Sequence, residues 1–272
     1  MRRFIAAAVA MAAALGLGLT AAQAAGEAKK PKEMVKSWEG PFGRFDMAQV
    51  QRGFQVYKEV CSACHSMNLM HYRNLGEKGG PYYDPKFPNA NENPYVRAIA
   101  AGYTFADRDA EGTEIERPGR PSDPFLKPFP DSYTARAANG GKEPPDLSVI
   151  IKARHGGADY VYSFLTGYNE EPPKGKEVPS GLYYNPYYAG GLVGMAPVIF
   201  DDRVTYQESE GNKGIKATES QIAQDVVAFL TWASEPKQQL RKETGMAVMI
   251  YLFILSLLLY VSYKQIWRNV EH

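Results

Sequence analysis

Two cysteines and a histidine form the part of this sequence best suited to chemistry. The run Cys61-Ser62-Ala63-Cys64-His65 holds both cysteines of the 272-residue chain. Two cysteines separated by two residues and followed directly by a histidine are typical of covalent c-type haem attachment. On one helical turn both thiols project to the same side, where they can form thioethers with the two vinyl groups of a porphyrin. The histidine is then held under the iron as an axial ligand, so the pattern predicts one covalently bound haem c.

Two other chemistries use closely spaced cysteines and make different demands on the sequence. A thioredoxin-like pair is expected in a βαβ unit, whereas the residues before Cys61 have the apolar spacing of a helix. A zinc site needs two further ligands, and the chain has no second cysteine pair. The remaining histidines are His71, His155 and His272. Haem attachment is therefore the favoured interpretation.

A haem iron that transfers electrons at high potential usually has methionine as its second axial ligand. Met67 and Met70 follow the motif so closely that they fall on the histidine's own side of the iron. Met195 stands far downstream in a Gly-rich segment that can lay a side chain against a flat macrocycle. The other methionines considered are Met34 and Met47 before the motif, and Met246 and Met249 in a C-terminal apolar run. The residues alone leave Met195 as either ligand or core packing, with His71 and His155 as competing ligands.

Two apolar segments predict export and a membrane anchor. Residues 1–24 have the basic start, Ala-rich apolar run and small-residue cleavage site of a secretory signal peptide. The run 245–263 carries no charge, and at a rise of about 1.5 Å per residue it spans roughly 28 Å, close to the thickness of a hydrocarbon core. The sequence thus predicts a periplasmic domain over 25–244, a transmembrane helix over 245–263 and a cytoplasmic tail over 264–272.

Apolar spacing predicts mainly α structure within the 25–244 domain. After a capping pair at Asp46 and Gln49, apolar residues recur at helical spacing up to Cys61. The further helices expected are 147–154, 158–166 and 219–233, the last with Thr218 as its cap. Residues 76–130 are dense in Pro, Gly, Tyr and Asp, which predicts a loop with little regular structure.

The charge balance excludes one large class of function. The chain has 31 basic and 30 acidic residues, for a formal net charge of +1. It therefore lacks the basic field that nucleic-acid binding requires, and any electrostatic recognition must come from local patches.

Several segments of the chain form a recognisable series. The first is the attachment motif with the helix before it, residues 52–67. The later ones are Ala135–Asn139, Pro144–Ser148, Arg154–Gly157, Leu165–Tyr168, Gly181–Pro186, Gly194–Pro197 and the single C-terminal anchor. In this order they resemble the cytochrome c1 family, the haem subunits of the quinol–cytochrome c oxidoreductase (cytochrome bc1) complex, and the resemblance covers most of the chain after the signal peptide. The signal peptide suggests a bacterial member.

This resemblance implies an α-helical class I cytochrome c core enlarged by long loops, with one C-terminal transmembrane helix. It implies one-electron transfer from a Rieske iron–sulfur subunit to a soluble or membrane-tethered cytochrome c, in a complex that also contains a cytochrome b subunit. The location implied is the bacterial inner membrane, with the haem domain in the periplasm. The alternatives are a free-standing anchored cytochrome that serves another dehydrogenase or oxidase, and an anchored thiol–disulfide enzyme.

The resemblance also assigns roles to particular residues. Cys61 and Cys64 attach the haem, and His65 and Met195 are its axial ligands. The residues implied to line the haem are Asn139, Pro145, Arg154 and Tyr160. Of these, Arg154 suits a haem propionate because guanidinium groups pair well with carboxylates, and Pro145, with Pro144, is expected to pack against the haem face.

The sequence departs from the family's pattern in two places. Some bacterial members carry an extra disulfide, and this chain has no cysteine to form one, so Met195 is expected to be held by packing alone. Residues 77–119 match least well and are partly acidic. Together with Glu170 and Glu171 they could present a docking patch to a basic cytochrome, or form an ordinary solvated loop.

Overall fold

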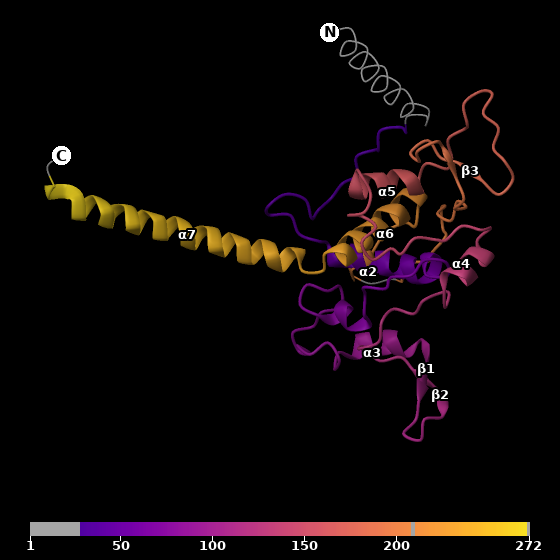
Figure 1. Ribbon diagram of the computed structural model, residues 1–272, viewed down its shortest axis with the longest axis horizontal. Helices are drawn as coiled ribbons and strands as arrows, with labels where there is room; N and C mark the ends of the chain where they lie inside the picture. The colour runs from indigo at the N-terminus through magenta and orange to yellow at the C-terminus, as the bar shows by residue number, and fades with distance from the viewer. Residues whose placement is uncertain (1–27, 208–209, 271–272) are drawn as a thin grey trace, which may run out of the picture.

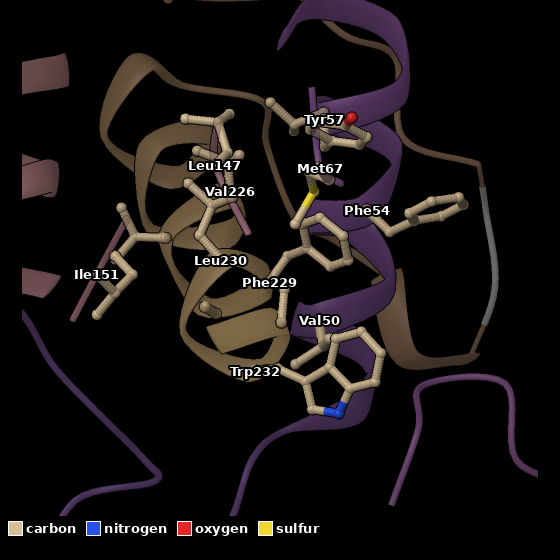
Figure 2. Packing of buried hydrophobic residues seen from close by; sticks show 14 of the residues in the cluster. Val50, Phe54, Tyr57, Met67, Leu147, Ile151, Val226, Phe229, Leu230 and Trp232 are labelled. Atoms are coloured by element: carbon tan, nitrogen blue, oxygen red, sulfur yellow. The ribbon is translucent and has the colours of Figure 1, made fainter. Parts of the chain in front are cut away.

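Helices α2 (Met47–Val56) and α6 (Glu219–Ser234) are far apart in the sequence and cross near the centre of the folded part of the chain (Figure 1). This part, the described residues before 238, is here called the head domain. The computed structural model describes residues 28–207 and 210–270. The signal peptide expected at 1–24 lies outside the described residues. Figure 2 shows the buried core between the two helices, where Phe54 of α2 lies beside Phe229 of α6.

Both helices begin at caps that the sequence predicts. Asp46 Oδ1 accepts hydrogen bonds from the backbone N–H groups of Ala48 at 3.0 Å and Gln49 at 3.3 Å. Thr218 Oγ1 accepts one from the N–H of Gln221 at 3.3 Å. These bonds satisfy N–H groups that the first turn of a helix leaves unpaired. Both predicted helices are confirmed, and α6 ends one residue beyond its predicted boundary.

A glycine and a buried ion pair define how closely α2 and α6 approach. A methyl group added at Gly53 would lie 1.9 Å from the carbonyl oxygen of Asp225 and 2.7 Å from Cβ of Phe229, so no larger residue fits there. Beside this contact, Arg52 donates from Nε to Asp225 Oδ2 at 2.9 Å and from Nη2 to Oδ1 at 3.1 Å. Because both side chains are buried, separating them would leave an unpaired charge in the core.

Aromatic rings extend this core from α6 toward the attachment motif. Phe229 packs against Phe54 and Tyr57, and Phe125 packs against Tyr57 and Tyr72. The indole Nε1 of Trp232 donates to the carbonyl of Gly79 at 2.8 Å, which satisfies the polar atom of a fully buried ring.

The other elements of the head domain are short and joined by long loops. Most of them are helices, which confirms the predicted mainly α fold. In chain order they are π-helix η2 (Tyr57–Cys61), 3₁₀-helix η3 (Tyr72–Gly76), α3 (Pro94–Ala101), β1 (Thr104–Arg108), β2 (Glu114–Pro118), α4 (Ser132–Ala138), α5 (Gly157–Leu165), β3 (Tyr183–Tyr184), β4 (Leu192–Val193) and 3₁₀-helix η4 (Glu210–Asn212). The strands form two antiparallel pairs: in β1–β2 Thr104 lies opposite Pro118, and in β3–β4 Tyr183 lies opposite Val193.

The prediction of an irregular loop over 76–130 is wrong in part, because this stretch contains α3 and the β1–β2 hairpin. Asn93 caps α3 by accepting hydrogen bonds from the N–H groups of Tyr95 and Val96, and Pro94 occupies the first helical position. The strands of the hairpin are largely exposed and show no alternation of apolar residues. Ion pairs of Arg117 with Asp107 and with Asp123 fix the hairpin instead.

The helix predicted over 147–154 is also wrong. The structure has hydrogen-bonded turns there, with Ile150 N donating to Leu147 O and Lys152 N to Val149 O. A single four-residue bond, from Ala153 N to Val149 O, does not continue into a helix, and Gly156 then adopts a left-handed conformation with φ 85° at the start of the next helix. The helix predicted over 158–166 is confirmed as α5, shifted by one residue.

Helix α7 (Gln238–Ile266) extends away from the head domain and none of its residues is buried (Figure 1). With the 3₁₀-turn η5 (Trp267–Asn269), it is the one helical segment in the described part of the chain that is long and apolar enough to cross a membrane. An apolar helix without a buried face is not a core helix of the head domain. Helix α7 therefore fits the predicted membrane anchor, and its first turns, 238–244, precede the apolar run.

Candidate haem-attachment site

The attachment motif ends the helix that α2 begins. The helix widens at η2, where Ser62 N donates to Tyr57 O at 2.8 Å across five residues. Such π-turns are frequent at functional sites. A tight turn follows, in which the N–H groups of Cys64 and His65 both donate to Cys61 O, at 3.1 Å and 2.9 Å. The two thiols and the histidine thus come from consecutive residues of one short turn.

The two thiols differ in their surroundings, and Cys61 is not poised for redox exchange. Cys61 is partly buried and packs against the core, whereas Cys64 is exposed, and they are not joined by a disulfide. Burial, with a smaller contribution from Cys64, raises the pKa of the Cys61 thiol to about 12. Thiol–disulfide enzymes need the opposite shift, because the thiolate is the reactive form. The pair therefore suits permanent thioether bonds better than disulfide exchange.

Three hydrogen bonds hold His65. Besides its backbone N–H bond to the motif turn, its carbonyl accepts from the hydroxyl of Tyr57 at 3.3 Å. Its ring Nδ1 lies 2.8 Å from the carbonyl oxygen of Pro145. Because a carbonyl only accepts, Nδ1 carries the proton and the lone pair of Nε2 is left for a metal. Burial lowers the pKa of His65, although the bond to Pro145 opposes this, and the neutral ring is the form that binds iron.

The segment 145–148 is hydrogen-bonded to the residues that directly follow the motif, 66–68. Asp146 Oδ2 accepts hydrogen bonds from Ser66 Oγ at 2.8 Å and from Asn68 N at 2.7 Å. Its Oδ1 accepts from Ser148 N at 2.9 Å, and Leu147 N donates to Ser66 O at 2.8 Å. Burial alone would raise the pKa of Asp146, but these hydrogen bonds outweigh it and lower the pKa. The segment therefore holds the Pro145 carbonyl in place as the acceptor for the histidine ring.

Replacing Asp146 is expected to loosen this arrangement. In Asp146→Ala the N–H groups of Asn68 and Ser148 lose their acceptor, which should reduce the free energy of unfolding by about 1–3 kcal/mol. Asp146→Asn keeps one carbonyl oxygen and should lose less. Denaturant unfolding of the detergent-solubilised chain measures both changes. Equal stability of the alanine variant and the parent would show that the segment does not hold the motif.

Met195 lies in the Gly-rich segment that directly follows β4, and hydrogen bonds help to hold it. Its carbonyl accepts from the hydroxyl of Tyr168 at 3.1 Å. Upstream, the fully buried Asn185 donates from Nδ2 to Phe164 O of α5 at 2.8 Å, which ties the β3–β4 segment to that helix. The expectation that Met195 is held by packing alone is therefore wrong. The side chain is partly buried against the core cluster.

The structure brings some of the expected haem-lining residues to the same core and leaves others at the surface. Tyr160 of α5 packs against the same buried cluster as Cys61 and Met195. Asn139 ends α4 and donates from Nδ2 to Ala135 O at 2.7 Å. Arg154 is exposed, and among the described residues its guanidinium has no carboxylate partner, donating only to Ala153 O. Such a guanidinium is available to an external carboxylate.

The two methionines next to the motif and the two competing histidines lie in different surroundings. Met67 and Met70 are buried in the core, and Figure 2 shows the sulfur of Met67 beside Phe229. His71 caps η3 and forms an isolated bridge with Pro124, and His155 is exposed at a turn. Within residues 28–207 and 210–270, no group of three or more His, Cys, Asp or Glu side chains gathers where it could hold a metal ion.

The acidic residues expected to form a docking patch are partly neutralised by neighbouring cations. On the hairpin, Asp107 pairs with Arg117 and Glu114 pairs with Arg108 at 2.6 Å. Glu170 pairs with Lys29 at 2.9 Å. A docking role for this surface stays a prediction.

The donor groups at this site fit a covalently attached haem. Two unpaired thiols lie on one turn with the imidazole of His65, whose Nε2 lone pair is free for a metal. The thioether side chain of Met195 lies in a segment that is hydrogen-bonded to α5. Sequence reasoning missed the roles of Tyr57 and Asp146. The Asp-x-Ser spacing in Asp146–Ser148 is the signal that could have pointed to Asp146, since it favours a local turn between a side-chain oxygen and a backbone N–H.

Comparison with known proteins agrees with the geometry. Residues 36–270 match the model of the Cytochrome C1 family. A "Cytochrome c1" from Rhodospirillum rubrum is 41% identical over 252 residues, which cover 87% of this chain and 87% of the relative. A "Cytochrome b-c1 complex catalytic subunit, mitochondrial" from Candida albicans is 44% identical over 220 residues, 80% of this chain and 71% of the relative. The "Cytochrome b/c1" of Bradyrhizobium diazoefficiens is 40% identical over an alignment of 286 positions, gaps included, that covers 97% of this chain but only 40% of that longer protein. Since the family match and the relatives span most of its length, this chain belongs to the cytochrome c1 family.

Proposed function

We propose that this chain is the haem-bearing electron-transfer subunit of a quinol–cytochrome c oxidoreductase (cytochrome bc1) complex, with one covalent haem c. The observation that carries the proposal is the ring of His65. Its Nδ1 is hydrogen-bonded to the Pro145 carbonyl. His65 directly follows Cys64, and both unpaired thiols lie on the same turn as the histidine. This is the arrangement that a c-type haem needs on its proximal side, and the family relatives support it.

Each site residue has a proposed role. Cys61 and Cys64 form the thioethers, and His65 and Met195 bind the iron axially. Pro145 orients the histidine ring through its carbonyl and packs on the haem face. Asn139, Arg154 and Tyr160 line the haem, with the exposed guanidinium of Arg154 paired to a propionate. When bound, the haem supplies a one-electron Fe(III)/Fe(II) couple, and the chain itself needs no acid, base or nucleophile.

The proposed partners are those of the complex. A Rieske iron–sulfur subunit donates the electron, and a soluble or membrane-tethered cytochrome c accepts it. The proposed neighbour in the membrane is a cytochrome b subunit. The name of the Bradyrhizobium relative, "Cytochrome b/c1", supports this neighbour, and the name of the Candida relative supports membership of the complex.

We assign the chain to the bacterial inner membrane with its head domain in the periplasm. Residues 1–24 are the cleaved signal, 25–244 the haem domain, 245–263 the membrane span and 264–272 the cytoplasmic tail. The apolar, unburied helix α7 supports the single span. The signal peptide supports the orientation, since it exports whatever follows it.

Purification from membranes in mild detergent tests the proposed complex. An affinity-tagged chain should bring down a b-type cytochrome and an iron–sulfur protein, and a quinol should reduce its haem rapidly. An inhibitor of quinol oxidation should abolish this reduction. A chain that is haem-loaded but purifies alone, and is reduced instead by another dehydrogenase, would contradict the assignment to this complex.

A further inference from the structure

Lys242, in the second turn of α7, is bound to a loop near the start of the described chain. Its ammonium donates to three carbonyl oxygens, those of Trp38 at 2.7 Å, Gly40 at 2.7 Å and Gly43 at 3.1 Å. An ammonium group has three donors, so all of them are used by residues 38–43, here called the 38–43 loop. One helix position further on, Glu243 pairs with Arg44 at 3.4 Å.

The geometry of α7 gives the depth of this loop relative to a membrane. Lys242 precedes the apolar run 245–263 by three residues, which is roughly 5 Å along a helix with a rise of about 1.5 Å per residue. Side chains on a helix lean toward its N-terminus, so the ammonium and the loop lie at the level of the first two turns. That level corresponds to the polar headgroup layer, just outside the hydrocarbon core.

The 38–43 loop is built to present one large apolar side chain. Its base is closed by Arg44 N, which donates to Ser37 O at 2.9 Å. Trp38 and Phe45 on either side are buried and stack with ring centroids 5.4 Å apart. Between them Phe42 is 78% exposed, in a loop whose ends and carbonyls are fixed. A phenylalanine held in this way at the surface has no packing role in the head domain.

We propose that the 38–43 loop is a second membrane contact, in which Phe42 enters the lipid–water interface beside α7. Figure 1 shows the indigo loop before α2 projecting on the side of the head domain from which α7 emerges. Continuity with the membrane anchor identifies lipid as the occupant, since the loop is bound to the last polar turn before the apolar run. Aromatic rings favour this interface because they present an apolar body at headgroup level.

Two points of attachment have a consequence for the whole domain. A domain joined to its anchor through one helix can tilt about the joint. Lys242 and Phe42 together would oppose that tilt and hold the head domain at one inclination to the membrane. The inference rests on α7 crossing a membrane and does not depend on the proposed haem chemistry.

Spin labelling tests the contact in the full chain, within its native complex reconstituted into phospholipid nanodiscs. A label at Phe42→Cys should be reached by dissolved oxygen in preference to a water-soluble nickel chelate. The oxygen-to-nickel accessibility ratio should be several-fold higher than at the matched control Tyr133→Cys, on exposed helix α4. A ratio equal to that of the control would overturn the proposal, and so would a label shielded from both reagents, which would indicate a protein partner.

Two further variants complete the test. Lys242→Gln in the Phe42→Cys background should lower the ratio toward the control, because the loop loses its ammonium, and an unchanged ratio would contradict the part assigned to Lys242. In the parent complex, this chain, separated from its partner subunits after labelling and weighed by mass spectrometry, should carry no label. Labelling of the parent would report free thiols at Cys61 and Cys64, which would count against the haem proposal and leave the membrane contact to be read from the difference between the chains.

Discussion

Met195→Leu is expected to lower the midpoint potential of the haem and remove the sulfur-to-iron absorption band in the near infrared. Leucine resembles methionine in volume, so the segment after β4 should keep its place through the Tyr168 and Asn185 hydrogen bonds. The thioether, however, favours ferrous iron, and its loss favours ferric iron. The potential should fall by on the order of 0.1–0.3 V, within the span of about 0.8 V that axial ligands cover. Redox titration of the purified chain measures the shift.

Met67→Leu is the matched control for this result. Met67 is close to the motif in sequence but is fully buried beside Phe229 (Figure 2). Its replacement by leucine should therefore leave both the potential and the near-infrared band unchanged. If Met195→Leu behaved like this control, Met195 would not be the ligand. His71 and His155 would then be the residues to replace next.

Replacing both cysteines, in Cys61→Ala with Cys64→Ala, is expected to abolish covalent haem. Each thioether needs one thiol, and no other cysteine exists in the chain. After denaturing electrophoresis the double variant should give no haem-dependent peroxidase stain, and much less of it should accumulate in membranes. Each single variant should keep one bond and stain, with its alpha band moved to longer wavelength because one vinyl group stays conjugated with the ring.

Ser62→Ala is the control within the same motif. The hydroxyl of Ser62, which the substitution removes, donates to Lys58 O at 2.8 Å in the helix before the motif, so its loss should leave haem attachment intact. Haem that stays bound to the double cysteine variant through denaturation would contradict the assignment of the two thiols.

Sequence reasoning located the elements whose apolar residues follow a regular period. Helices α2 and α6 each have a capping residue and a face that enters the core, so both periodicity and local chemistry pointed to them. The β1–β2 hairpin could not be predicted from apolar periodicity because its strands are mostly exposed. It depends instead on ion pairs between Arg117 and two aspartates. Helix α3 could not be predicted for another reason: Asn93 and Pro94, which begin it, are also typical turn residues and stand in a stretch rich in such residues.

The candidate site divides in a similar way between what residue types reveal and what only the backbone reveals. Cys61, Cys64 and His65 could be named from their types and spacing alone. The acceptor for the histidine ring could not, because any residue offers a carbonyl and only the fold brings that of Pro145 to 2.8 Å from Nδ1. The same holds for Met195: spacing left its role open, and the Asn185 bond to α5 that helps to position it joins residues distant in sequence.

The intact mass of the chain, purified from membranes and analysed after denaturation, tests covalent haem attachment at Cys61 and Cys64 directly. We expect the mass of residues 25–272 plus one haem, with no thiol open to alkylation at either cysteine. A chain with the mass of the polypeptide alone and two alkylatable thiols would contradict it.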